Sequence, residues 1–173
     1  MEQPSKIFNL GLLKYVVGDA TMTRGGGHRL LIHVVNDVGA WGRGFVLAVS
    51  KRWKKPYEQY RIWYRSQSDG RVPFALGQIQ VVDVQSDLAV VNMIAQHDIM
   101  TKDGVPPVRY DALRSCLEKV AQEAKDRNSS VHCPRICSGL AGGDWQEVEP
   151  LLIECLINKG INVTVYDLPK GVA

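Results

Sequence analysis

The sequence predicts an α/β fold of three layers, in which helices cover both faces of a central mixed and mostly parallel sheet. Three observations lead to this prediction. The second half of the chain alternates between helical and strand patterns, and residues 28–35 are almost all apolar, as in a strand buried on both faces. Glycine-rich turns at 39–44 and 137–143 each lead from a predicted strand into a predicted helix.

The first half of the chain mixes strands and helices. Strands are expected at 12–17 and 28–35, and a helix is expected at 45–53. Pro56 should end that helix, and a further helix is expected at 57–65. The remaining segments are a polar, turn-rich stretch at 66–73, two strands at 78–84 and 88–95, and a loop at 96–107.

The second half begins with a long amphipathic helix at 110–127. Its apolar stripe contains Leu113, Leu117, Val120 and Ala124. A strand at 131–136, a helix at 144–158 that ends at Gly160, and a closing strand at 161–166 complete the chain. No repeat or linker divides it, so we expect one domain over 1–173 with its core at about 12–168.

Composition narrows the functional classes. The 173 residues are 45% apolar and 23% charged, which is ordinary for a globular domain. The net charge of +3 gives no strong sign of general nucleic-acid binding, and the basic cluster Lys51, Arg52, Lys54 and Lys55 is expected to be a solvated helix end. No apolar run is long enough to span a membrane, and no signal peptide is visible.

The four cysteines form no CxxC pair and have no histidines at zinc spacing. We therefore expect reduced thiols, a cytoplasmic location and no metal or cofactor. The sequence also lacks both common nucleotide fingerprints, G-x-G-x-x-G after its first strand and G-x-x-x-x-G-K-[ST]. The two glycine-rich loops remain the main functional signal, because glycines and a helix N-terminus together hold an anion.

Four patches of the sequence, in this order and at these intervals, resemble the macrodomain family. They are Val17-Gly18-Asp19-Ala20, then Leu31-Ile32-His33 with Asn36 and Gly39-Ala40-Trp41-Gly42-Arg43-Gly44, then Pro134-Arg135-Ile136-Cys137-Ser138-Gly139-Leu140 through Trp145, and Val163-Thr164-Val165-Tyr166-Asp167-Leu168. Within the family, the chain is most similar to the branch of ADP-ribose-1''-phosphate phosphatases and terminal ADP-ribose protein glycohydrolases. The resemblance implies a domain that binds ADP-ribose.

The resemblance also implies roles for the residues of the first half. Asp19 would read the adenine amine, with the backbone of Ala20 beside it; the alternative is an aspartate that caps its own turn. Asn36 would contact the distal ribose, or else tie down the adjacent loop. The loop that would wrap this ribose and part of the diphosphate contains Gly39, Ala40, Trp41, Gly42, Arg43, Gly44 and Phe45. Trp41 would shield the ribose from water, or else be a core residue; Arg43 would add charge near a phosphate, or else face outward.

In the second half, the diphosphate would lie on the second glycine loop, and Trp145 follows it. The backbone of this loop is supplied by Ser138, Gly139, Leu140, Ala141, Gly142 and Gly143. Asp144 is either a general base or the cap of the helix that it precedes, since Asp144-x-x-Glu147 is a capping-box spacing. Tyr166 would pack on the adenosine or else close the sheet.

The chain departs from the glycohydrolase pattern at two catalytic positions. Gln96 stands near the position of the nucleophilic lysine, and Ala141 near that of the acidic residue. A glutamine forms no Schiff base and an alanine moves no proton. The acid–base candidates that remain are His33, His97 and Asp144, together with the phosphates of the ligand itself or a water held by the backbone.

These observations lead to one expectation and one alternative. We expect a monomeric ADP-ribose-binding domain that hydrolyses a group from the distal ribose, with His33 and Asp144 as catalytic candidates. The partner would be ADP-ribose or an ADP-ribosylated substrate, either protein or nucleic acid. The alternative is a module that reads ADP-ribose without cleaving it.

Overall fold

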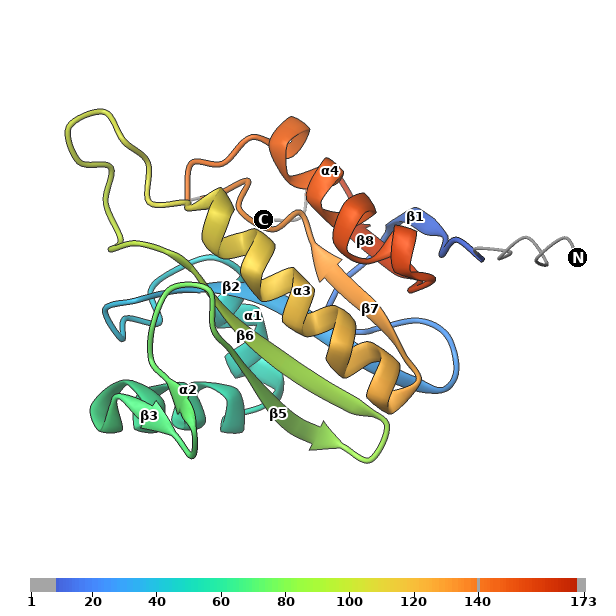
Figure 1. Ribbon diagram of the computed structural model, residues 1–173, viewed down its shortest axis with the longest axis horizontal. Coiled ribbons are helices and arrows are strands. Elements are labelled where there is room, and N and C mark those ends of the chain that lie inside the picture. The colour runs from blue at the N-terminus through green and yellow to red at the C-terminus, as the bar shows by residue number, and fades with distance from the viewer. Residues whose placement is uncertain (1–8, 140, 171–173) are drawn as a thin grey trace, which may run out of the picture.

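The computed structural model describes residues 9–139 and 141–170. The centre of the fold is a six-stranded mixed sheet (Figure 1). Across the sheet the strands run in the order β1-β8-β7-β2-β6-β5. All neighbours are parallel except β5 and β6, which form an antiparallel edge. The strands are β1 (Leu13–Val17), β2 (His28–Asn36), β5 (Ile79–Gln85), β6 (Leu88–Gln96), β7 (Ser129–Pro134) and β8 (Val163–Asp167).

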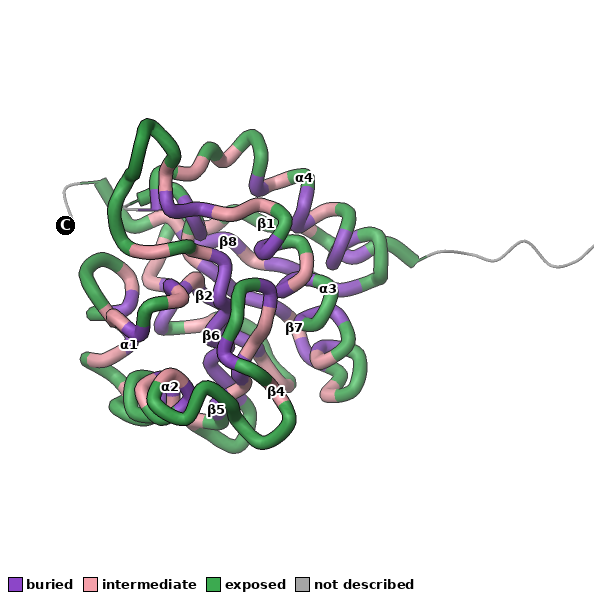
Figure 2. The backbone as a smooth tube through the Cα atoms, turned by 60° about the vertical axis from the view of Figure 1, so that its left-hand side comes forward, coloured by how far each residue is buried: buried purple, intermediate pink, exposed green. Residues whose placement is uncertain are grey.

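Helices cover both faces of the sheet, so the fold has the three layers predicted from the sequence (Figure 1). One face carries α1 (Phe45–Arg52) and α2 (Lys55–Ser66), and the other carries α3 (Tyr110–Arg127) and α4 (Trp145–Cys155). The strand-rich centre is where the buried residues gather (Figure 2). Strand β6 is buried along almost its whole length, as a central strand between two helical layers must be.

Several boundaries differ from the expected ones. Pro56 does not break a helix; it lies at the start of α2, where its missing N–H costs no hydrogen bond. The predicted turn at 66–73 contains a short hairpin, β3 (Ser68–Asp69) and β4 (Val72–Pro73). The last predicted helix divides into α4 and a 3₁₀ turn, η1 (Ile157–Lys159).

The parallel strands place their carboxyl ends along one edge of the sheet. The chain leaves β1 into residues 18–21, β2 into 37–44, β6 into 97–107, and β7 into 135–143. Ligands of α/β folds bind in the crevice outside the carboxyl ends of such strands. This edge is therefore the place to look for a site.

Candidate functional site

The larger of two neighbouring cavities at this edge has a volume of about 480 Å³. It opens between the ends of β1 and β8 on one side and helix α1 on the other. Of the predicted ligand-binding residues, it brings together Asp19, Ala20, Phe45 and Tyr166. The rest of the wall consists of residues that were not predicted to bind a ligand, which are Gly18, Thr21, Ala48, Lys51, Arg52, Pro134 and Leu168. Ala48 and Arg52 are four residues apart and so lie on one face of helix α1, and this spacing could have indicated that they share a wall.

Asp19 both caps its turn and faces the larger cavity. Its Oδ1 accepts hydrogen bonds from the amide and the hydroxyl of Thr21, at 2.8 and 2.7 Å. Arg52 Nε donates to the same hydroxyl at 2.7 Å, which ties the turn to the end of α1. Within the described residues, Oδ2 of Asp19 has no hydrogen-bond partner. The two readings of Asp19 are therefore compatible, since one oxygen holds the turn and the other can accept a ligand N–H.

Tyr166 forms the floor of the larger cavity and is only 3% exposed. Its hydroxyl accepts from the amide of Arg24 at 2.9 Å and lies 2.8 Å from Nδ1 of His132. Burial raises the pKa of this phenol. The hydroxyl is thus committed to the core, and only the ring is available to a ligand.

The smaller cavity, of about 210 Å³, lies beside the larger one and shares Phe45 and Pro134 with it. Among the predicted site residues it brings together His33, Arg43, Gly44, Phe45, Gly139 and Ala141. Its wall also contains Gln96 and Arg135, from the ends of β6 and β7. We call the two adjoining cavities the cleft; Phe45 lies where they meet.

The N-terminus of helix α1 lies at this junction. Gly44 caps the helix with a φ of 85°, and no side chain accepts a hydrogen bond from the first-turn amides. Helix α4 differs, because Asp144 Oδ1 accepts from the amide of Gln146 at 2.9 Å. A carboxylate therefore already occupies the positive end of α4, whereas the amides of Phe45 and Val46 at the start of α1 have no side-chain cap and lie beside the cleft, where they can meet an anion.

His33 projects from β2 against the rings of Trp41 and Phe45, with ring centroids 5.4 and 6.0 Å away. The imidazole is 2% exposed, and burial lowers its pKa to about 4. Nε2 lies 2.5 Å from Oδ1 of Asn92, whereas Nδ1 has no partner among the described residues. At neutral pH the ring is uncharged and weakly basic.

Asn36 binds the loop that follows it. Its Oδ1 accepts from the amides of Val38 and Ala40, both at 3.1 Å, and from the hydroxyl of Tyr60 at 2.8 Å. Its Nδ2 donates to the carbonyl of Ala40. Asn36 is 6% exposed and does not line either cavity, so its amide holds the first glycine loop in place.

Trp41 also packs inward. Its Nε1 donates to the carbonyl of Val46 at 3.0 Å and to the hydroxyl of Ser50 at 2.8 Å. Neither Trp41 nor the adjoining positions Gly39, Ala40 and Gly42 line the two cavities. At Gly39, a Cβ would stand 2.2 Å from the ring of Tyr64, so this glycine permits a close approach of helix α2.

The second glycine loop reaches the smaller cavity with Gly139 and Ala141. Ser138, Gly142 and Gly143 lie outside its wall, and Leu140 lies outside the described residues. A Cβ on Gly143 would stand 2.6 Å from the carbonyl oxygen of Cys137, which shows how tightly the loop folds on itself.

Asp144 and Trp145 lie away from the cleft wall. Trp145 packs against Tyr15, and its Nε1 donates to the hydroxyl of Tyr15 at 3.1 Å. The guanidinium of Arg135 lies over both rings, 5.0 Å from that of Tyr15 and 5.1 Å from that of Trp145. Asp167 accepts from Arg135 at 2.8 and 3.0 Å, so the two rings and this carboxylate together hold Arg135, which lines the smaller cavity.

The described wall of the smaller cavity contains no lysine, aspartate or glutamate. Gln96 and Ala141, which stand near the two catalytic positions of the glycohydrolases, both line it. Cys137 does too, but burial raises the pKa of its thiol to about 12. The described part of this wall thus offers no ionised nucleophile at neutral pH.

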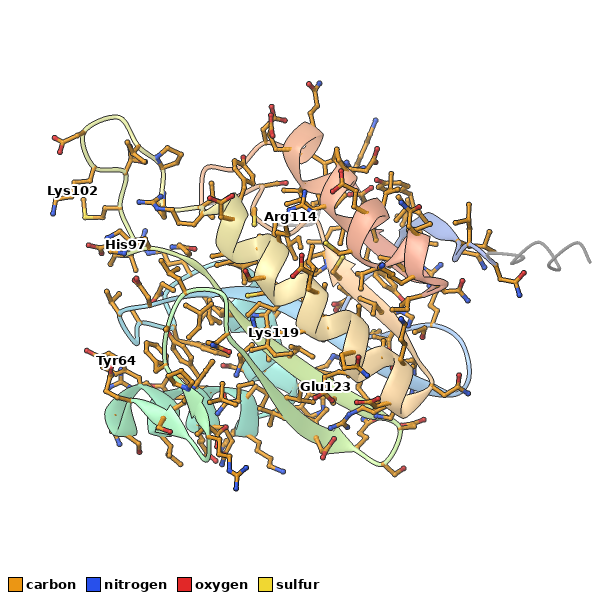
Figure 3. The ribbon with its side chains drawn as sticks, in the orientation of Figure 1. Tyr64, His97, Lys102, Arg114, Lys119 and Glu123 are labelled. Atoms are coloured by element: carbon orange, nitrogen blue, oxygen red, sulfur yellow. The ribbon has the colours of Figure 1, made fainter. Side chains whose placement is uncertain are left out.

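Two further candidates from the neighbouring loop lie outside the cleft. His97 Nδ1 is 2.7 Å from Oδ2 of Asp37, on the rim of the fold. Lys102 lies near the tip of the loop and points away from the sheet (Figure 3). Neither residue lines either cavity.

The described residues contain neither a metal-ligand cluster nor a membrane-spanning helix. Within 9–139 and 141–170, no three His, Cys, Asp or Glu side chains group as metal ligands would. No helix in the same ranges has the length and apolarity needed to cross a membrane.

Comparisons with known proteins agree with the fold. A macrodomain protein from Streptomyces coelicolor is 47% identical, with 90% of this chain aligned to 99% of that one and a TM-score of 0.79. A Bacteroides thetaiotaomicron protein of unknown function is 50% identical over 91% of this chain and 99% of its own, with a TM-score of 0.88. Thermosipho africanus DarTG, solved in complex with ADP-ribose, shares the fold at 19% identity, with 93% of this chain and 42% of that chain covered and a TM-score of 0.70.

Among curated proteins, mouse chromodomain-helicase-DNA-binding protein 1-like is 31% identical over 166 residues. The alignment covers 93% of this chain but only 18% of that protein, so the chain spans less than a fifth of its length. No family model matches the chain.

Proposed function

Since the chain belongs to the macrodomain family, as 47% identity over 99% of the Streptomyces macrodomain establishes, we propose that its cleft binds ADP-ribose. The observation that carries this proposal is the joined pair of cavities with an uncapped helix N-terminus between them. ADP-ribose has an aromatic base at one end, a diphosphate in the middle and a sugar at the other end. This order matches a cavity, a helix N-terminus and a second cavity.

Each part of the ligand has a matching region of the cleft. The adenosine lies in the larger cavity, where Asp19 Oδ2 accepts from the adenine amine and the ring of Tyr166 provides an apolar floor. The diphosphate lies at Gly44 and Phe45, against the first-turn amides of α1. The distal ribose enters the smaller cavity.

A blocking substitution tests this arrangement. Ala48→Trp places an indole in the larger cavity, whereas Leu47→Trp adds the same side chain at an exposed neighbour that does not line it. We expect Ala48→Trp to weaken ADP-ribose binding by at least about tenfold, or 1.4 kcal/mol, in a calorimetric titration. Equal affinity of both variants would exclude the larger cavity as the binding site.

A second candidate function is hydrolysis at the distal ribose, and Arg43 on the wall of the smaller cavity favours it. Arg135 lines the same cavity but is already held by Asp167 through hydrogen bonds of 2.8 and 3.0 Å, so Arg43 is the cation that suits a phosphate on that ribose. Candidate substrates are ADP-ribose-1''-phosphate, O-acyl-ADP-ribose and ADP-ribose esters of proteins or nucleic acids. With no lysine or acid on the described wall, a bound water assisted by the ligand's phosphates would have to attack.

Turnover separates this candidate from a module that only reads ADP-ribose. Each substrate is incubated with the protein, and the released phosphate or acyl group is measured against a protein-free control. Release that disappears in Arg43→Ala supports hydrolysis. Tight binding of all three substrates without release supports a module that binds ADP-ribose and does not cleave it.

A further inference from the structure

We propose that the larger cavity accepts an adenosine with a phosphate on the 2′-hydroxyl of its ribose, and that Arg52 and Lys51 bind this phosphate. The ligand class is ADP-ribose that carries a further phosphate on its adenosine side. That the cavity holds adenosine at all rests on the proposed function.

The basic cluster at the end of helix α1 divides into two parts. Lys51 and Arg52 line the larger cavity, whereas Lys54 and Lys55 do not. Lys55 Nζ donates to the carbonyl of Asp83 at 3.1 Å, and Lys54 is exposed. Cations in the last turn complement the helix dipole whichever way they face. The dipole therefore accounts for Lys51 and Arg52 on the helix, but not for their place on the cavity wall.

Arg52 is held at the cavity through one of its three nitrogens. Its Nε donates to Oγ1 of Thr21 at 2.7 Å, and Thr21 lines the same cavity. Among the described residues, no hydrogen bond uses Nη1 or Nη2 of Arg52. A guanidinium that is already positioned, with two amino groups free, suits the oxygens of a phosphate.

The charges of this wall exceed what a neutral nucleoside requires. The described wall contains two cationic residues, Lys51 and Arg52, and one acidic residue, Asp19. None of the ion pairs within the described residues includes any of the three. Adenosine has no anionic group, and the diphosphate is placed at the other end of α1. A second anion on the adenosine side would supply the missing partner.

Helix α1 runs along the cavity from the diphosphate position to these cations. Phe45, Ala48 and Arg52 share one helix face, because residues three, four and seven apart lie together. Each residue advances a helix by about 1.5 Å, so Lys51 lies about 4.5 Å beyond Ala48 along the axis. The ribose, between diphosphate and base, would therefore lie near Ala48, and the cations would lie beyond it.

The position of Arg52 selects the 2′-hydroxyl of that ribose. Thr21, which binds Arg52, also donates from its hydroxyl to Oδ1 of Asp19, so the guanidinium lies at the adenine end of the cavity. The 2′-carbon adjoins the carbon that carries the base, whereas the 3′-carbon adjoins the one that carries the 5′ arm. In dinucleotide-binding folds, an arginine near this ribose accommodates the 2′-phosphate of NADP.

Calorimetric titration of the unaltered protein with ADP-ribose and with ADP-ribose 2′-phosphate tests the proposal. The 2′-phosphate should raise the affinity about tenfold at low salt, and this preference should shrink as added salt screens the exposed charges. Equal or weaker affinity for the 2′-phosphorylated ligand would overturn the proposal.

Paired variants separate a local contact from a general attraction to a cationic protein. Lys51→Gln and Lys54→Gln each remove one positive charge, but only Lys51 lines the cavity. The ratio of the two affinities should fall at least about threefold in Lys51→Gln and stay unchanged in Lys54→Gln. Arg52→Gln should lower the same ratio, and Arg52→Lys, which keeps the charge, should recover part of it. Equal ratios in Lys51→Gln and Lys54→Gln would contradict the proposed contact.

The titrations distinguish two kinds of failure. Absence of binding by both ligands would refute the proposed function and the 2′-phosphate site together. Binding of ADP-ribose with no gain from the 2′-phosphate would refute the 2′-phosphate site alone.

Discussion

Asn36→Ala is expected to destabilise the protein even without a ligand, because the side chain anchors the first glycine loop. The substitution removes four hydrogen bonds, three accepted by Oδ1 and one donated by Nδ2. Each bond contributes about 0.5–1.5 kcal/mol net. Three of the four are only partly buried, so we expect a loss of about 2–4 kcal/mol in the free energy of unfolding.

Urea unfolding of the ligand-free variant measures this loss directly. Asn36→Asp is the matched comparison, since it keeps an oxygen for the amides of Val38 and Ala40 but loses the donor to the Ala40 carbonyl. It should therefore fall between the unaltered protein and Asn36→Ala. A loss below about 1 kcal/mol for Asn36→Ala, combined with weakened ADP-ribose binding, would refute the loop-anchor reasoning and favour a direct contact with the ribose.

Three further predictions concern the second loop, the buried histidines and the adenine contact. Gly143→Ala should weaken ADP-ribose binding at least about tenfold, because its Cβ would stand 2.6 Å from a backbone carbonyl oxygen and displace the second glycine loop; Gly26→Ala, which lines neither cavity and whose Cβ meets nothing within 4 Å, should not. His33 and His132, each with its pKa lowered by burial to about 4, should make unfolding easier as the pH falls from about 6.5 to 4, by up to about 1.4 kcal/mol per pH unit each. Asp19→Asn should keep the turn but lower ADP-ribose affinity about tenfold.

The controls for these predictions follow from their causes. The unfolded chain takes up protons that the buried rings refuse, so the histidine contribution is complete above about pH 6.5, and a flat stability profile from pH 7 to 5 would contradict it. For Asp19→Asn, an analogue with unsubstituted purine in place of adenine lacks the amine and carries no other hydrogen-bonding group at that carbon. The variant and the unaltered protein should bind this analogue alike.

Much of the fold could be predicted because local patterns determined it. The helix at 110–127 has the bounds that its periodicity predicts, and β2 has the apolar run of a strand buried on both faces. Pro56 was misread because a proline that ends one helix and one that begins the next have the same sequence signature. Only the chain geometry after Trp53 separates the two.

The site was less predictable, because walls of a cavity come from several strands. Asp19 and Phe45 were named from their motifs, and both line the cleft. Trp145 was predicted to bind the ligand but packs against Arg135 instead. Arg135, which was not named as a ligand-binding residue, lines the smaller cavity. Asn92 on β6 hydrogen-bonds Gln80 on β5 at 3.1 Å and lies 2.5 Å from Nε2 of His33 on β2, and no spacing in the sequence reveals such contacts between strands.

Calorimetric titration with AMP, ADP and ADP-ribose tests the central claim most directly, which is that one ligand occupies both cavities. We predict micromolar binding of ADP-ribose, roughly −8 kcal/mol, with affinity falling for ADP and falling further for AMP. Each truncation removes a group that has its own region of the cleft. The absence of heat with ADP-ribose, or equal affinity for AMP and ADP-ribose, would contradict the account.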